Sequence, residues 1–155
     1  MTNAEKVVDK LIEYGYHISF AESCTGGLCC GELVGVANAS KVLDMSFVTY
    51  ANEAKIKLLG VKTDTILSNG VVSEQVAFEM AQGVCEKSGS EVGIGITGVA
   101  GPGGGTDKKP VGMVCFGFCV NGETETYTEY FGEIGRNEVR SKSVDFVFNK
   151  LMDIL

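Results

Sequence analysis

The sequence predicts an α/β protein: a three-layer α/β/α arrangement with a mixed sheet containing an antiparallel hairpin. Two observations lead to this prediction. Segments with helical apolar periodicity alternate with short apolar segments typical of strands. In addition, Asn121-Gly122, a dipeptide typical of two-residue hairpin turns, joins two strand-like segments. Because no linker or internal repeat divides the 155 residues, we expect residues 1–155 to form a single domain.

The first half of the chain has clear helix boundaries. Thr2 and Glu5 have the spacing of a capping box, and Gly15 ends the helix that they begin. Asn52 is the expected cap of a later helix, which Gly60 ends. The elements expected in this half are a helix over 2–15, a strand over 16–21, a helix over 28–34, a helical turn at 38–40, a strand over 45–51 and a helix over 52–59.

The second half begins with a helix that Ser73 opens and that reaches about residue 87. Residues 91–97 are typical of a buried strand, and a glycine-rich loop follows over 98–110. The hairpin strands are expected over 111–120 and 123–130. A terminal amphipathic helix over 136–155 is predicted by its apolar face, which consists of Val139, Val144, Val147, Phe148 and Leu151.

Charge and composition narrow the class of partner. The formal net charge is −7, and the Lys and Arg residues are scattered, whereas proteins that bind nucleic acid cluster positive charge. No apolar run approaches the length of a membrane span, and the N-terminal residues predict a helix instead of a signal peptide. We therefore expect a cytoplasmic protein with a small-molecule partner, no nucleic acid and no membrane.

The six cysteines do not predict a metal site, because no C-x-x-C pair occurs and His17 is the only histidine. Cys29, Cys30, Cys115 and Cys119 lie in apolar segments, where small buried thiols are common. Cys24 stays open as a candidate nucleophile, since a thiol at a helix N-terminus can have a lowered pKa.

The segment Ala-Glu-Ser-Cys-Thr-Gly-Gly, residues 21–27, joins a predicted strand to a predicted helix. A strand that ends in small residues and opens a helix leaves backbone N–H groups free to hold an anion or an oxyanion. Ser23 at this turn is either a helix N-cap or a nucleophile, with Gly26 and Gly27 beside it.

A Ser-His-Asp triad is excluded, because His17 lies six residues before Ser23 on the same strand, at a distance of about 20 Å. A Ser-Lys pair is a known alternative when the lysine can become neutral. Lys55 is the best candidate, since it falls in the first turn of a helix, where the macrodipole disfavours an ammonium ion. A solvated surface lysine is the competing interpretation.

Two glycine-rich patterns in the sequence resemble motifs that bind phosphate groups. The match to G-x-G-x-x-G at residues 93–98 lies on a strand with no helix after it, which argues against a dinucleotide site. The loop from Gly98 to Gly105, which includes Gly101, lacks the ending of a P-loop. Its glycines allow close approach of the backbone to a ligand, or serve only as a tight connection before the hairpin.

Several segments match one family in order and spacing: AESCTGG at 21–27, Ser40, FVTYANEAK at 47–55, LGV at 59–61, GVVSEQVAFEMAQG at 70–83, ITGVAGPGGGTDKKPVG at 96–112, and residues 135–140. On these segments the chain resembles the CinA C-terminal domain family, whose members act as nicotinamide mononucleotide (NMN) deamidases. The resemblance covers nearly the whole chain. Many family members carry an additional N-terminal pyrophosphatase domain, and we expect none of its activity here.

The resemblance implies a Ser-Lys amidohydrolase that converts NMN to nicotinate mononucleotide and ammonia without a cofactor. Ser23 would be the nucleophile, Lys55 the general base and Ser40 a bridging proton relay. The resemblance also implies substrate contacts at Tyr50 and Thr97 and, for the phosphate, at either Arg136 or Arg140. From the turn and the glycine-rich loop we add Gly26, Gly27, Gly98 and Gly101 as candidate substrate contacts.

Other functions stay open beside this one. They are a non-catalytic module that binds nucleotide phosphate, an amidohydrolase that uses Cys24, and an accessory protein in competence or DNA repair. We also expect a homo-oligomer, because the chain is apolar and its helices are one-sided.

Overall fold

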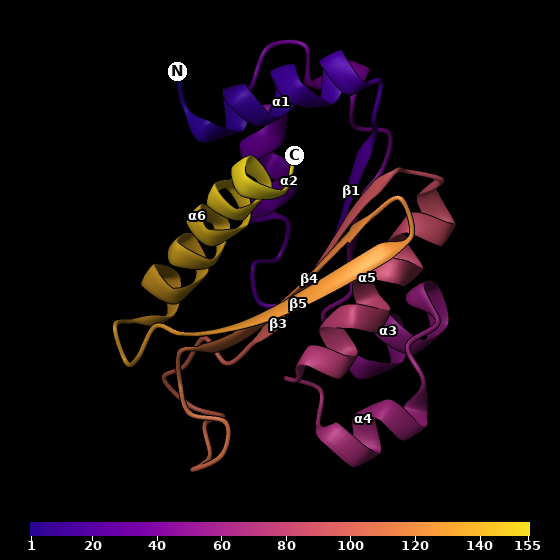
Figure 1. Ribbon diagram of the computed structural model, residues 1–155. Coiled ribbons are helices and arrows are strands. Elements are labelled where there is room, and N and C mark those ends of the chain that lie inside the picture. The colour runs from indigo at the N-terminus through magenta and orange to yellow at the C-terminus, as the bar shows by residue number, and fades with distance from the viewer.

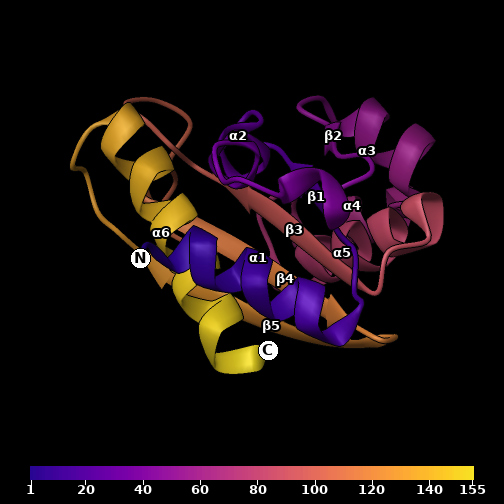
Figure 2. The same cartoon turned by 90° about the horizontal axis from the view of Figure 1, so that it is seen from above.

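The computed structural model describes residues 1–155 and contains a five-stranded mixed sheet with six α-helices on its two faces (Figures 1 and 2). The helices are α1 (Asn3–Tyr14), α2 (Leu28–Val34), α3 (Asn52–Leu59), α4 (Thr63–Asn69), α5 (Glu74–Ser88) and α6 (Arg136–Ile154). The strands are β1 (Ile18–Glu22), β2 (Phe47–Val48), β3 (Val92–Gly98), β4 (Met113–Val120) and β5 (Glu123–Tyr130). A short 3₁₀ turn covers Ala39–Lys41.

The strand order is β2-β1-β3-β4-β5. The pairs β1–β2 and β1–β3 are parallel, whereas β3–β4 and β4–β5 are antiparallel. Helices α1, α2 and α6 cover one face of the sheet, and α3, α4 and α5 lie on the other (Figure 2). The predicted α/β fold with a mixed sheet and a hairpin at Asn121-Gly122 is therefore confirmed.

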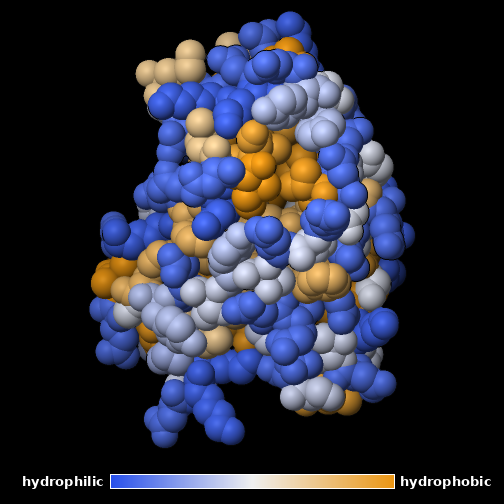
Figure 3. All heavy atoms as spheres, in the orientation of Figure 1, coloured by the Kyte–Doolittle hydropathy of each residue, from blue (hydrophilic) through white to orange (hydrophobic).

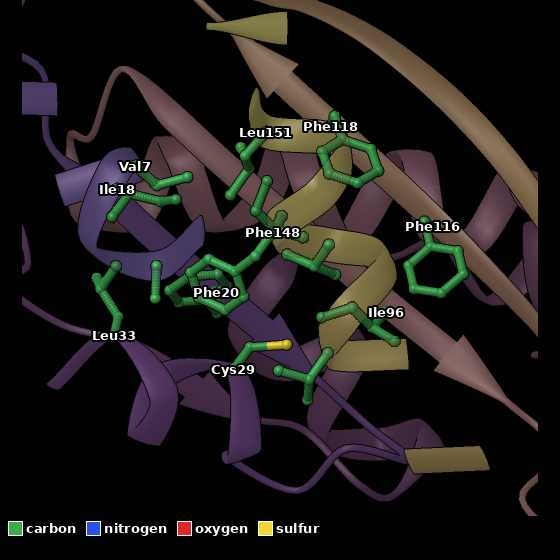
Figure 4. Close-up of a cluster of buried hydrophobic side chains, with 14 of the residues drawn as sticks. Val7, Ile18, Phe20, Cys29, Leu33, Ile96, Phe116, Phe118, Phe148 and Leu151 are labelled. Atoms are coloured by element: carbon green, nitrogen blue, oxygen red, sulfur yellow. The ribbon is translucent and has the colours of Figure 1, made fainter. Parts of the chain in front are cut away.

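The larger hydrophobic core lies between the sheet and helices α1, α2 and α6. Phe20 of β1 and Phe148 of α6 meet there with their ring centroids 6.3 Å apart, and Ile96 and Cys29 pack nearby (Figure 4). The opposite face of the sheet is packed mainly by α5. Gly95 and Gly117 lie beneath this helix, where a Cβ atom would come within 2.6 Å and 2.3 Å of the Ala77 carbonyl oxygen. These glycines allow α5 to approach the sheet closely.

Several predicted helix ends are confirmed. Thr2 and Glu5 form a capping box, and Ser73 caps α5 by accepting the Val76 N–H. Gly15 and Gly60 end their helices in the left-handed conformation. One cap was predicted wrongly: α3 is preceded by Ala51 as its N-cap, and Asn52 is its first helical residue.

Two elements differ from the prediction. The strand expected over 45–51 is only Phe47–Val48, because the Ser46 hydroxyl accepts the Phe20 N–H in place of a ladder carbonyl. Helix α4 was not predicted. None of its residues is buried, so its sequence does not show the periodic apolar residues by which an amphipathic helix is recognised. Instead, the Glu79 carboxylate of α5 holds its start by accepting the Lys62 N–H and the Thr65 hydroxyl.

Hydrophilic residues cover most of the face seen in Figure 3, and a hydrophobic hollow lies below α1 on that face. No helix has the length and apolar character that crossing a bilayer requires. The structure also holds no cluster of three or more His, Cys, Asp or Glu side chains arranged to bind a metal ion.

Candidate active site

Ser23 directly follows β1, at the carboxyl end of a strand with parallel neighbours on both sides. The Ser23 N–H donates to the Ile96 carbonyl of β3. On the other side of β1, Thr49, the residue directly after β2, donates its N–H to the Glu22 carbonyl. Ser23 is 9% exposed. In open α/β sheets, ligands bind in the crevice outside the carboxyl ends of the strands. The serine is therefore held where a ligand would be expected.

Lys55 is buried and points at this serine. Its side chain is only 1% exposed, and its Nζ lies 3.0 Å from Oγ of Ser23. The same Nζ donates to the backbone carbonyls of Thr49 at 2.7 Å and Tyr50 at 3.0 Å. The interpretation of Lys55 as a solvated surface residue is thus wrong, because α3 turns this side chain into the protein.

Burial lowers the pKa of the Lys55 ammonium from 10.5 to about 8. Removing a charge from water disfavours the charged form, and no carboxylate lies close enough to compensate. The one ion pair in the structure joins His17 and Asp44. A substantial fraction of Lys55 is therefore neutral near pH 8, which a general base requires.

The three partners of Nζ define the direction of its lone pair. Two of them, the carbonyl oxygens of Thr49 and Tyr50, can only accept hydrogen bonds. In a neutral amine they take both hydrogens, so the lone pair is directed at the third partner, the Ser23 hydroxyl. This arrangement can draw a proton from Ser23 without a histidine.

A cavity of about 280 Å³ opens beside the Ser23–Lys55 pair. This volume is close to the lower end of the range for ligand pockets, about 300–1,000 Å³. The cavity is lined by Ser23, Cys24, Tyr50, Asn52, Lys55, Val71, Val72, Thr97, Gly98, Val99, Ala100, Gly101, Gly103, Gly104 and Arg136. The glycine-rich loop therefore forms one wall, as expected for a backbone that approaches a ligand.

Most of the predicted substrate contacts meet at this cavity. Thr97, Gly98 and Gly101 line it from the end of β3 and the loop that follows. The Thr97 hydroxyl donates to the Val71 carbonyl, which joins that loop to the start of α5. Tyr50 lines the mouth and is 61% exposed, so its ring is free to contact a ligand.

The two candidate arginines have different positions. Arg136 lines the cavity, where its guanidinium donates to the Gly101 carbonyl at 2.7 Å and the Tyr50 hydroxyl at 2.9 Å. Arg140, one helical turn later, does not line the cavity and instead contacts the carbonyls of Cys24 and Thr25. Arg136 is therefore the arginine that can reach a bound anion.

Gly26 and Gly27 shape the turn without lining the cavity. Both have positive φ angles, +57° and +101°, which side chains other than glycine rarely adopt. Gly27 is also the N-cap of α2, with no side-chain cap. Ser23 therefore does not act as an N-cap, which removes the competing interpretation of this residue.

Ser40 is not brought to the site. It is exposed in the 3₁₀ turn Ala39–Lys41 and lines a separate hollow with Val34, Val36 and Leu43. It makes no hydrogen bond with Ser23 or Lys55, which contact each other directly. The structure leaves no gap between these two residues for Ser40 to bridge within this chain.

Cys24 lines the cavity, but its environment opposes nucleophilic chemistry. Burial raises the pKa of the Cys24 thiol to about 12, where the prediction allowed for a lowered value at a helix N-terminus. The thiolate is the reactive form, so this thiol stays protonated at neutral pH. The remaining cysteines are free thiols.

Sequence reasoning missed Glu22. Its side chain is fully buried, and its carboxylate accepts the N–H groups of Cys29 and Cys30 at the start of α2. An acidic residue between an apolar run and a helix start is a signal for such a contact. The N–H groups of Cys29 and Cys30 already donate to Glu22. They are therefore not free to bind a substrate anion, as the sequence had suggested for the start of this helix.

Sequence reasoning also missed Lys109 in the glycine-rich loop. Its Nζ donates to the carbonyls of Asn69, at 2.5 Å, and Val72. These contacts tie the loop to the segment that carries the cavity residues Val71 and Val72. A lysine within a glycine-rich loop gives no sequence signal for this role, because its partners are backbone atoms about 40 residues away.

The fold and site thus define an α/β protein with a buried Ser-Lys pair at the carboxyl end of a parallel strand. The chain belongs to the CinA family: the model of the CinA C-terminal domain matches residues 1–155.

Relatives and solved structures agree with this assignment. A CinA-like protein of Kosmotoga olearia is 45% identical over 155 residues, which cover 97% of this chain and 37% of that protein. A competence/damage inducible protein from Agrobacterium tumefaciens is 39% identical, with a TM-score of 0.91 over 99% of this chain and 96% of the other. A CinA superfamily protein from Escherichia coli is 33% identical, with a TM-score of 0.95 over 99% and 88% of the two chains. The chain spans only about a third of the length of the curated relatives.

Proposed function

We propose that this chain hydrolyses the carboxamide of NMN to nicotinate mononucleotide and ammonia by a Ser-Lys mechanism. The observation that carries the proposal is the 3.0 Å contact between Nζ of Lys55 and Oγ of Ser23 at the wall of a cavity. The family resemblance supplies the substrate class. The names of the similar proteins refer to competence and damage induction, not to this reaction.

The first half of the reaction forms an acyl-enzyme. Neutral Lys55 takes the proton of Ser23 while Oγ attacks the carboxamide carbon, and backbone N–H groups of the Ser23 turn stabilise the oxyanion. Protonated Lys55 then gives its proton to the leaving nitrogen, which departs as ammonia. Lys55 needs no third residue for these transfers, because it contacts Ser23 directly.

The second half removes the acyl group. Water attacks the ester of Ser23, neutral Lys55 takes the proton of that water, and the proton returns to Oγ as nicotinate mononucleotide leaves. Arg136 at the cavity wall would hold the phosphate, with Tyr50 beside it. A guanidinium suits this task, because it offers paired donors to phosphate oxygens.

The decisive experiment measures ammonia and nicotinate mononucleotide released from NMN by the purified chain and by Ser23→Ala. We expect turnover in the wild type and none in the variant. The variant should stay folded, since the hydroxyl makes one hydrogen bond, worth about 1 kcal/mol.

The alternatives give different results. A module that only binds nucleotide phosphate would show a thermal shift with NMN but release no ammonia. Turnover by Ser23→Ala near the wild-type rate would remove the serine from the mechanism. Alkylation of thiols tests the Cys24 alternative, because it would then inactivate the protein as fully as Ser23→Ala does.

A further inference from the structure

Arg140 donates hydrogen bonds to the turn that follows Ser23, the candidate nucleophile. Its Nε donates to the Cys24 carbonyl at 2.9 Å, and its Nη2 donates to the Thr25 carbonyl at 3.3 Å. Its Nη1 donates to Oδ1 of Asn137 at 3.0 Å, which holds the guanidinium in place. A Cβ atom at Gly26 would lie 3.3 Å from Nη2, so glycine allows this close approach.

These contacts orient the peptide groups of the turn. In a trans peptide the C=O and the N–H point in opposite directions. Because Arg140 holds the Cys24 carbonyl, the N–H of Thr25 points away from Arg140. In the preceding peptide, the Ser23 carbonyl accepts the Gly26 N–H, which fixes the direction of the Cys24 N–H.

The N–H groups of Cys24 and Thr25 donate no hydrogen bond to another residue, although both residues are buried, and Cys24 lines the cavity. Buried backbone donors without partners are rare and need an explanation. The donors at the start of α2 are already used, since Cys29 and Cys30 donate to Glu22. The free donors next to Ser23 are therefore the two whose peptide planes Arg140 and the turn hold.

We propose that Arg140 is a positioning residue that holds the Cys24–Thr25 peptide, so that the free N–H groups of the turn receive the oxyanion formed at Ser23. A donor from the residue after a nucleophile is a recurring part of oxyanion holes, and Cys24 has that place here. Preorganised donors avoid reorganisation during the reaction. This inference rests on the proposed function only for its nucleophile, and it does not depend on NMN as the substrate.

A fluorophosphonate probe tests the geometry without a substrate. Oγ of Ser23 forms a bond to phosphorus, the P–F bond breaks, fluoride leaves, and Lys55 takes the serine proton. The phosphoryl oxygen then occupies the place of the oxyanion. We would compare labelling rates of the full chain with those of Arg140→Met and Arg140→Lys. The matched control is Lys142→Met, which removes an exposed cation from the same helix.

We expect Arg140→Met to be labelled about 100-fold more slowly, the size of effect seen when one oxyanion donor is lost. Arg140→Lys should fall between, because one ammonium reaches one carbonyl, and Lys142→Met should match the wild type. With NMN, Arg140→Met should lower kcat and leave KM unchanged. Melting temperatures identify folded variants, and Arg140→Lys carries the test if Arg140→Met does not fold.

Labelling of folded Arg140→Met at the wild-type rate would overturn the inference. So would a rise in KM with kcat unchanged, because Arg140 would then act in substrate binding. If the wild type is labelled at Ser23 but releases no ammonia from NMN, the proposed substrate fails, and the labelling comparison still decides the role of Arg140.

Discussion

Nζ of Lys55 and Oγ of Ser23 lie 3.0 Å apart, although 32 positions separate the two residues in the chain. The contact depends on the ends of two parallel strands. Ser23 directly follows β1, and the segment directly after β2 contains the Thr49 and Tyr50 carbonyls that accept hydrogen bonds from Lys55. Charge attraction does not explain the pair, because serine is neutral. The pair exists because backbone carbonyls satisfy a buried amine and direct it at one hydroxyl.

The first prediction concerns Lys55→Arg. This variant keeps a positive charge, but a guanidinium is effectively always protonated and cannot accept the Ser23 proton. We therefore expect Lys55→Arg to be as inactive as Lys55→Ala when ammonia release from NMN is measured. Substantial activity in Lys55→Arg would show that the charge of Lys55 matters instead of its basicity.

The pH profile of activity provides a second test. Burial lowers the pKa of Lys55 to about 8, and the neutral form is the base, so activity should rise with pH and reach half its maximum near pH 8. Ionic strength should change the midpoint little, since burial and not a neighbouring charge sets it. A flat profile between pH 6 and pH 9 would contradict the assignment of Lys55 as the base.

Stability should also depend on pH through this lysine. The folded pKa is about 8 and the reference value is 10.5, so the unfolded chain binds more protons between these values. The free energy of unfolding contributed by Lys55 therefore rises with pH in that window. Denaturant unfolding of the wild type and Lys55→Met at pH 7 and pH 10 measures the effect: the wild type should gain stability relative to the variant. An equal response of both proteins would mean that Lys55 is not buried as an amine.

The phosphate prediction concerns Arg136. Because its guanidinium lines the cavity, Arg136→Ala should raise KM for NMN far more than it changes the hydrolysis of nicotinamide riboside, which has no phosphate. Steady-state kinetics with both substrates decide the matter. The same rise in KM for the two substrates would argue that Arg136 only shapes the cavity through Gly101 and Tyr50.

Ser40→Ala is expected to keep close to the wild-type rate of ammonia release. The residue is exposed and lies in a separate hollow, while Lys55 contacts Ser23 without an intermediate. Its melting temperature should also change little, as for most surface substitutions. A loss of turnover comparable with that of Ser23→Ala would restore Ser40 as a proton relay, for example through a second copy of the chain.

Local patterns in the sequence were enough to predict most of the fold. The capping box at Thr2, the Ser73 cap, Gly15, Gly60 and the Asn121-Gly122 turn are short-range signals, and each is found where it was expected. Helix α4 lacked such signals, because one side chain of α5, Glu79, holds its start and the helix buries no residue. The strand β2 is shorter than expected, because the Ser46 side chain replaces a backbone partner.

By itself, the sequence determined the order of the elements other than α4, the turn that carries Ser23 and the candidacy of Lys55, since these follow from residues close together in the chain. The tertiary structure alone decided which residues meet: it placed Arg136 at the cavity, Arg140 on the turn and Ser40 away from both. It also decided the protonation of Lys55, because a pKa depends on burial and on neighbours contributed by other segments. Glu22 shows the same limit, as its role depends on where α2 begins in space.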